Sequence, residues 1–211
     1  MSKMKPIIII NFKTYKQGKQ VLKLAKAIEK VDKTIIVGVQ DSDIEEIARK
    51  TKLKVFSQHV DSLKPGKHTG FIIPEAVKKD GAIGTFLNHS EHKLKFEILK
   101  KTIKRCKEVG LNTAVFAASL REAKKIVKLK PNYLIIEPPE LVGGKISVSK
   151  AKPELIKNIA KKLKYPFLVG AGIHNKEDVK IAMKLGAKGI AVSSAIATAK
   201  NPEKKLRELL G

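Results

Sequence analysis

Residues 7–13 read Ile7-Ile8-Ile9-Ile10-Asn11-Phe12-Lys13, and this stretch carries the pattern that decides the fold. Four β-branched residues in a row favour a β-strand that is apolar on both faces. Strands of this kind are typical of a parallel sheet that helices cover on both sides. Comparable stretches recur along the whole chain, and they predict eight strands: Ile7–Asn11, Ile35–Val39, Lys54–Gln58, Gly84–Asn88, Thr113–Ala117, Tyr133–Glu137, Phe167–Gly170 and Gly189–Ser193.

Lysine-rich segments with the spacing of amphipathic helices separate the predicted strands. Their apolar residues recur at intervals of three and four, as in helices that bury one face. The clearest sets are Val21, Leu24, Ala25 and Ile28; Leu94, Ile98, Thr102, Ile103 and Cys106; and Val179, Ala182, Met183 and Gly186. The weakest helical segment is Pro74–Asp80. Eight strand–helix units predict an α/β protein with one (β/α)8 barrel domain over residues 1–211, and an open doubly wound sheet is the main alternative.

Composition narrows the class of protein. Of the 211 residues, 43% are apolar, which is enough for one sizeable core and too many for a disordered chain. No apolar run approaches the ~18 residues that span a bilayer, and Ile7–Ile10 is too short for the core of a signal peptide. The single cysteine, Cys106, excludes an internal disulfide and predicts a buried thiol on an apolar helix face. We therefore expect a cytoplasmic protein.

The chain is strongly basic, with 44 Lys and Arg residues, 20 Asp and Glu residues and a net charge of +24. The lysines are spread over the helical segments rather than gathered in one block, which is typical of solvated helix faces. Aromatic residues make up 5% of the chain, so surfaces for stacking nucleic-acid bases are scarce. We expect the positive field to attract small anionic substrates, and a nonspecific attraction for nucleic acid stays open.

Polar residues gather where the predicted strands end, which is where barrel enzymes hold their active sites. Asn11 and Lys13 follow the first strand, His89 and Glu91 follow the fourth, and Glu137 follows the sixth. A carboxylate that directly follows an apolar strand is partly desolvated and suited to act as a base. The alternatives at this stage are a structural histidine at position 89 and a surface acid at position 137.

Small residues follow the last two predicted strands, as Gly170-Ala171-Gly172 and Ser193-Ser194. Backbone N–H groups in such turns approach an anion closely, and this part of a barrel is a common phosphate site. His59 and His68 lack the spacing of metal ligands relative to nearby acids, and we assign them no function.

Taken in order, the motifs at the strand ends resemble those of the triosephosphate isomerase family in its shorter archaeal form. The motifs are Asn11-Phe12-Lys13, Asn88-His89-Ser90-Glu91, Glu137-Pro138-Pro139-Glu140-Leu141-Val142-Gly143 and Gly170-Ala171-Gly172. The resemblance extends over nearly the whole chain, and the second and third motifs are highly specific in combination. It implies a TIM barrel that interconverts dihydroxyacetone phosphate and D-glyceraldehyde 3-phosphate without a cofactor or a metal.

The resemblance also implies roles for single residues. Glu137 is the expected base, a neutral His89 donates to the substrate oxygens, and Lys13 supplies positive charge. Asn11 helps to position Lys13 and polarises a substrate oxygen, while Glu91 supports the network of charges. The residues implied to bind the substrate and its phosphate are Asn11, Lys13, Gly143, Gly172, Ser193 and Ser194.

The segment Pro138–Lys145 corresponds to the lid of the family. It ends in Gly143-Gly144-Lys145, where the family usually has glycine–threonine–glycine. His92-Lys93 stand where the family favours an arginine, and Ser193-Ser194 stand where many members have two glycines. These departures concern the efficiency of the enzyme and the motion of its lid rather than the reaction.

The resemblance further implies a homo-oligomer, because members of the family form dimers and archaeal members form tetramers. Lys67-His68-Thr69-Gly70 corresponds to the loop that reaches into a neighbouring subunit, and a tetramer is favoured over a dimer. Two other functions stay open. One is a different phosphate-binding barrel enzyme, such as an epimerase, which would not account for Lys13, His89 and Glu137 together. The other is a basic nucleic-acid-binding protein built on an inactive barrel.

Overall fold

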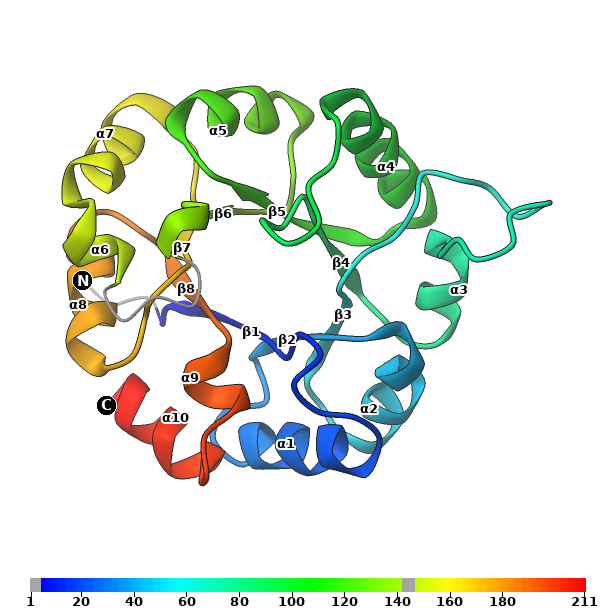
Figure 1. The fold of residues 1–211 in the computed structure, drawn as a ribbon, viewed down its shortest axis with the longest axis horizontal. Coiled ribbons are helices and arrows are strands. Elements are labelled where there is room, and N and C mark those ends of the chain that lie inside the picture. The colour runs from blue at the N-terminus through cyan, green and yellow to red at the C-terminus, as the bar shows by residue number, and fades with distance from the viewer. Residues whose placement is uncertain (1–4, 142–146) are drawn as a thin grey trace.

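A computed structural model describes residues 5–141 and 147–211, which form a closed barrel of eight parallel strands (Figure 1). Each strand pairs with the next one along the chain, and β8 pairs with β1 to close the ring. The strands are β1 (Ile7–Asn11), β2 (Ile36–Val39), β3 (Lys54–Ser57), β4 (Gly84–Leu87), β5 (Asn112–Ala117), β6 (Tyr133–Ile136), β7 (Leu168–Val169) and β8 (Gly189–Val192). All eight predicted strands are confirmed with their ends within one residue, and the open-sheet alternative is wrong because the ring closes.

Helices surround the barrel and follow the strands along the chain (Figure 1). The α-helices are α1 (Lys19–Glu29), α2 (Ile44–Lys50), α3 (Pro74–Lys79), α4 (Phe96–Val109), α5 (Leu120–Ile126), α6 (Val148–Ala151), α7 (Pro153–Leu163), α8 (Lys176–Lys184), α9 (Ser194–Ala197) and α10 (Pro202–Leu210). Short 3-10 turns cover Asp41–Asp43, Val127–Leu129 and Pro139–Leu141. Over the described ranges, no helix is long and apolar enough to cross a bilayer.

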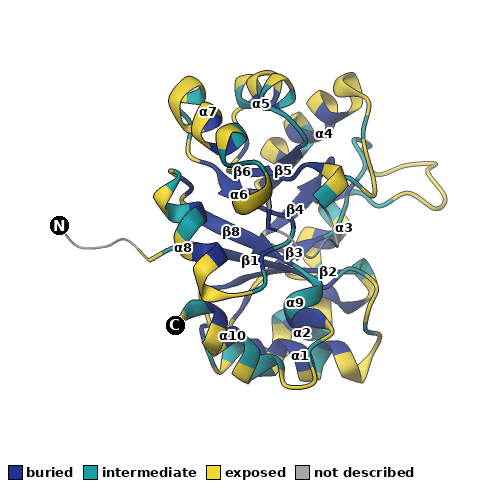
Figure 2. Ribbon diagram, turned by 60° about the vertical axis from the view of Figure 1, so that its left-hand side comes forward, coloured by how far each residue is buried: buried dark blue, intermediate teal, exposed yellow. Residues whose placement is uncertain are grey.

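The outer faces of the helices are exposed to solvent, whereas most strand residues are buried (Figure 2). On α4 the lysines at positions 100, 101, 104 and 107 are exposed, while Leu99, Ile103 and Cys106 are buried. This confirms the interpretation of these lysines as a solvated helix face. Burial raises the pKa of the Cys106 thiol to about 12, which is the behaviour of an inert core residue.

The prediction for the buried face of α4 was wrong at Ile98, whose exposed fraction is 40%. The helix begins at Phe96, so Leu94 precedes it, and the stripe that faces the sheet begins at Leu99. Ile98 lies one position before this stripe, about 100° around the helix axis, and therefore points away from the core. Gly186 lies just beyond the end of α8, with a φ of +105°, so it marks the end of this helix rather than its buried face.

Three phenylalanine rings pack together with aliphatic side chains inside the barrel. The rings of Phe56 and Phe86 lie 6.0 Å apart, and those of Phe86 and Phe116 lie 5.6 Å apart. Glycine makes room for these rings, because a Cβ atom on Gly38 would lie 2.0 Å from the Phe86 ring. The Phe116 ring in turn packs edge to face against the imidazole of His89, with the two ring centroids 4.8 Å apart. The packed interior thus supports the residues above it.

Candidate active site

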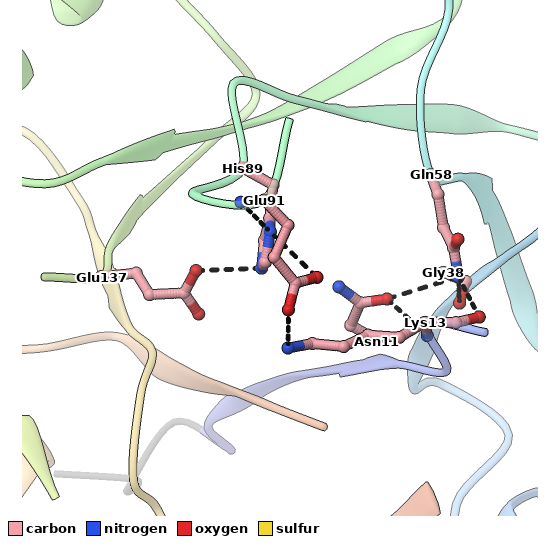
Figure 3. A network of polar contacts seen from close by, with 7 residues as sticks. All are labelled: Asn11, Lys13, Gly38, Gln58, His89, Glu91 and Glu137. Atoms are coloured by element: carbon pink, nitrogen blue, oxygen red, sulfur yellow. Dashed lines mark hydrogen bonds and ion pairs between the residues drawn. The ribbon is translucent and has the colours of Figure 1, made fainter. Parts of the chain in front are cut away.

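The first polar group of the site comes from the end of β1. The side-chain oxygen of Asn11 accepts the backbone N–H of Lys13 at 2.9 Å, which turns the chain sharply after the strand. Lys13 adopts a φ of +46°, a left-handed conformation that costs a non-glycine residue about 1–3 kcal/mol. Strain of this kind persists where the surrounding contacts hold it, and here it directs the lysine across the mouth of the barrel (Figure 3).

Lys13 forms an ion pair with Glu91, which comes from a different part of the barrel mouth. Its Nζ lies 2.6 Å from Oε1 of Glu91, which follows β4. The lysine side chain is only 14% exposed, whereas the glutamate side chain is 54% exposed. The pair therefore holds a mostly buried ammonium group in place while the carboxylate stays in contact with water.

His89 follows β4, and its ring orientation is fixed from two sides. The backbone N–H of Glu91 donates to Nδ1 at 3.2 Å, and Phe116 packs against the ring. An Nδ1 that accepts a hydrogen bond carries no proton, so a neutral imidazole holds its proton on Nε2. That nitrogen points toward the centre of the site, where it lies 3.0 Å from Oε2 of Glu137 (Figure 3).

Glu137 directly follows β6, and its backbone N–H donates to Ala117 at 2.9 Å. Its side chain is 9% exposed, and the contact between Oε2 and His89 lacks the geometry of a hydrogen bond, so this oxygen has no hydrogen-bond partner among the described residues. Gly170 makes space for the carboxylate, since a Cβ atom there would lie 2.8 Å from Oε1. A desolvated carboxylate with a free oxygen is suited to accept a proton.

The far side of the site consists of small residues on the turns after β7 and β8. Ala171 and Gly172 have φ values of +73° and +66°, so two consecutive residues are left-handed. Ser193 and Ser194 stand at the beginning of α9. These residues line one cavity together with Asn11, Lys13, His89 and Glu137. The structure therefore brings the predicted residues from β1, β4, β6, β7 and β8 to one place, while Gly143 lies outside the described residues.

Known proteins are similar to this chain over nearly its whole length. A sequence profile of the family described as triosephosphate isomerase matches residues 6–209. The chain is 40% identical to the triosephosphate isomerase of Methanocaldococcus jannaschii, over 97% of this chain and 98% of the relative. It is 41% identical to the enzyme of the same name from Sulfurisphaera tokodaii, over 97% of this chain and 94% of the relative. The chain belongs to the triosephosphate isomerase family.

One residue at the site of this triosephosphate isomerase family member was missed by the sequence analysis. Gln58 directly follows β3, and its side-chain amide donates to the backbone oxygen of Lys13 at 2.9 Å (Figure 3). The signal was present, because Gln58 ends a predicted strand as Asn11 and Glu137 do. A glutamine has no acid–base chemistry of its own, and this is why the position drew no attention.

A second cavity of about 650 Å³ opens beside the first, between the loops that follow β1 to β4. His59 and His92 line it, and their rings stack at 4.1 Å. Burial, and secondly the His92 ring, lower the pKa of His59 below its usual value, although Asp61 opposes the shift. His92 is one of the residues that depart from the usual triosephosphate isomerase pattern, and the stacked pair is a contact that sequence spacing did not suggest.

Proposed function

We propose that this protein interconverts dihydroxyacetone phosphate and D-glyceraldehyde 3-phosphate, with Glu137 as the base. One observation carries the proposal: the buried carboxylate of Glu137 and the Nε2 atom of His89 face each other at 3.0 Å, in a cavity that Lys13 also lines. The family reaction needs these three groups, because a proton must move between adjacent carbons while charge develops on the neighbouring oxygen.

The proton transfer is balanced by Glu137 and His89 alone. The Glu137 carboxylate takes a proton from the carbon beside the carbonyl group, and the electron pair of that C–H bond moves toward the carbonyl oxygen to give an enediolate. The Nε2–H of His89 donates to the enediolate oxygens and moves a proton between them. Glu137 then returns its proton to the adjacent carbon, which regenerates the carboxylate and completes the isomerisation.

Lys13 stabilises the negative charge that gathers on the enediolate and the phosphate. Its side chain is only 14% exposed, so its charge is screened less by water than that of an exposed lysine. Asn11 holds the turn that carries Lys13 and polarises a substrate oxygen. Glu91 supports both neighbours, since its carboxylate pairs with Lys13 and its backbone N–H holds the imidazole of His89.

The phosphate of the substrate binds where the chain offers small residues and backbone N–H groups. Gly172, Ser193 and Ser194 line the cavity opposite Lys13, and close approach of a phosphate to the backbone is possible there. Gly143 completes this set by its position in the family motif. By the family resemblance, residues 138–145 correspond to the lid that excludes water from the enediolate, and residues 142–145 of this segment lie outside the described part of the chain. The described part of this segment includes the 3-10 turn Pro139–Leu141.

The chain acts as a homo-oligomer, in which a tetramer is favoured over a dimer. The segment after β3 leaves the barrel and projects beyond the helices (Figure 1). At its base the backbone N–H of Asp61 donates to the backbone oxygen of Ile72, and the backbone N–H of Ile72 donates to the Asp61 carboxylate. Lys67–Gly70 lies exposed within this segment. This loop carries positive charge, whereas Asp41 and Glu91 line the cavity of about 650 Å³. We propose that this loop of a second copy enters that cavity, which Lys13 lines as well.

The charge of +24 steers the anionic substrate toward the protein, which works in the cytoplasm. The same field attracts nucleic acid without sequence preference, and this attraction weakens steeply as salt rises.

The test is the isomerisation of D-glyceraldehyde 3-phosphate by the purified protein, coupled to glycerol-phosphate dehydrogenase. The Glu137→Ala variant, purified in the same way, controls for contaminating host enzyme. Activity that disappears in this variant supports both the reaction and the base. Equal activity in the two preparations identifies a contaminant, and a folded but inactive wild-type protein overturns the proposal.

A further inference from the structure

Gln58 joins three strand ends at the site. Its backbone N–H donates to Val39 at 3.2 Å, which fixes the residue against the end of β2. Its side chain extends inward under the turn that carries Lys13 (Figure 3). Within the described part of the chain, no other side-chain amide donates to the Lys13 carbonyl oxygen.

The amide nitrogen of Gln58 faces only oxygen atoms. It lies 2.9 Å from the backbone oxygen of Lys13, 3.2 Å from that of Gly38 and 3.4 Å from the side-chain oxygen of Asn11. The Asn11 oxygen already accepts the N–H of Lys13, and the Gly38 oxygen already accepts the N–H of Phe12. Two backbone N–H groups, those of Phe12 and Lys13, thus hold the turn after β1, and the NH₂ group of Gln58 adds a third contact to it.

The turn needs this support because Lys13 is left-handed. A residue with a φ of +46° and a side chain relaxes toward a commoner conformation unless its neighbours hold it. Relaxation at Lys13 would rotate the Cα–Cβ bond and carry the ammonium group away from Glu91 and the cavity. The Gln58 amide resists this rotation, since it binds the carbonyl group of the strained residue itself.

We infer that Gln58 is a positioning residue, whose amide holds Lys13 in the left-handed turn that aims its ammonium group at the anionic substrate. The inference rests on the proposed function for the identity of that substrate. Gln58 touches no reacting atom in this account, and its whole effect on turnover passes through Lys13.

The test is a double-mutant cycle with Gln58→Met and Lys13→Met. Methionine keeps the length and the packing of glutamine but donates no hydrogen bond. We expect Gln58→Met to lower kcat/KM by about 10- to 100-fold in the wild-type background, as a displaced catalytic group does, with both a lower kcat and a higher KM. In the Lys13→Met background we expect less than a twofold further loss, because nothing is left to position.

Gln17→Met is the matched control. The Gln17 amide donates to the backbone oxygen of Thr14 at 2.6 Å, so it supports the same loop one residue further on, and it is exposed. This variant is expected to keep its activity and its melting temperature. A Gln58→Met loss of the same size in both backgrounds would show a general structural role, and unchanged activity of Gln58→Met would overturn the inference outright.

A binding measurement separates this inference from the proposed reaction. Titration of inorganic phosphate into wild type, Gln58→Met and Gln17→Met by calorimetry reports on Lys13 without turnover. We expect weaker binding only in Gln58→Met. If the wild-type protein is inactive but Gln58→Met still binds phosphate more weakly than wild type, the proposed reaction is wrong and the positioning role stands. Equal affinities in all three proteins would overturn the positioning role. Gln58→Glu, which has the same shape but cannot donate when ionised, gives a second reading if Gln58→Met folds poorly.

Discussion

The two halves of the barrel mouth are built differently. Around β1 to β4, polar side chains bind one another: Lys13 pairs with Glu91, and Gln58 and Asn11 hold the turn beneath the lysine. Around β6 to β8, small residues and turns prevail. There, Oε2 of Glu137 and Oγ of Ser193 are buried and have no hydrogen-bond partner within the described ranges (5–141 and 147–211).

The difference indicates that the two halves of the site have different functions. Preorganised donors and charges stabilise a transition state because they need no rearrangement as charge develops. In the β1–β4 half Lys13, Glu91, Asn11 and Gln58 already bind one another, although the Ser90 hydroxyl at the end of β4 is buried without a hydrogen-bond partner among the described residues. In the β6–β8 half the Ser193 hydroxyl accepts and donates no hydrogen bond among the described residues, so it is able to donate to a substrate phosphate, and Oε2 of Glu137 accepts no hydrogen bond there, so it is able to take a substrate proton. We call the residues after β1 to β4 the rigid half and those after β6 to β8 the receptive half. The two halves meet at the contact between His89 and Glu137.

The largest expected effect is that of Glu137→Gln, which removes the base from the receptive half. The amide has the shape of the carboxylate, so we expect an unchanged melting temperature and a loss of kcat by about 10²- to 10⁴-fold. Steady-state kinetics and thermal unfolding measure the two quantities. Glu154→Gln is the control, since Glu154 is exposed on α7 and pairs with Lys157. If Glu137→Gln kept most of its kcat, the base would lie elsewhere.

Lys13→Met tests the rigid half and is expected to have the next largest effect. Loss of a preorganised charge costs about 10²- to 10³-fold in turnover, and KM rises as well because the ground state also carries the phosphate charge. Glu91 is half exposed, so its carboxylate regains water and the fold keeps its stability. Lys16→Met, in the same loop, is expected to behave like wild type. A Lys13→Met variant with a changed KM but an unchanged kcat would restrict the lysine to binding.

Gly170→Ala disturbs the boundary of the receptive half. The new methyl group would lie 2.8 Å from Oε1 of Glu137 and 3.3 Å from Ile135, so the carboxylate must move. A displacement of about 1 Å lowers turnover by about 10²-fold, and we expect a fall of this order in kcat with a smaller change in KM. Gly66→Ala is the control, because its Cβ atom meets nothing closer than 3.5 Å. Wild-type kinetics for Gly170→Ala would show that the receptive half tolerates movement of its base.

The smallest expected effect is on stability and comes from His59, beside the rigid half. The pKa of His59 is lowered in the folded state, chiefly by burial, so the unfolded chain takes up a proton first as the pH falls below about 6.5. Stability from this residue is present above that pH and is lost as the pH falls toward the folded-state pKa.

The measurement is chemical denaturation of wild type and His59→Gln at pH 7.5 and at pH 5.5. We expect the variant to lose less stability than wild type between the two values. Asp41, whose pKa is raised chiefly by burial, acts in the opposite direction, and its contribution cancels when the two proteins are compared. A pH dependence that is the same in both proteins would contradict a lowered pKa of His59 in the folded protein.

Much of the local structure followed from the sequence. The strands were predictable to within one residue because each is a short apolar run bounded by polar residues, and this pattern is local. The residues at the strand ends were predictable for the same reason. Once a parallel barrel is assumed, every strand end lies at the same rim, so Asn11, His89 and Glu137 must meet.

Only the tertiary structure decided the contacts between residues that no spacing rule connects. The closure of β8 on β1, the donation of Gln58 to Lys13 across 45 positions and the stacking of His59 on His92 all depend on how the ring is packed. Glycine at position 38 is explained in the same way, by an aromatic ring from β4 that occupies the place of its side chain. Sequence periodicity records which face of an element is apolar, whereas partners across a barrel are set by close packing of side chains that lie far apart along the chain.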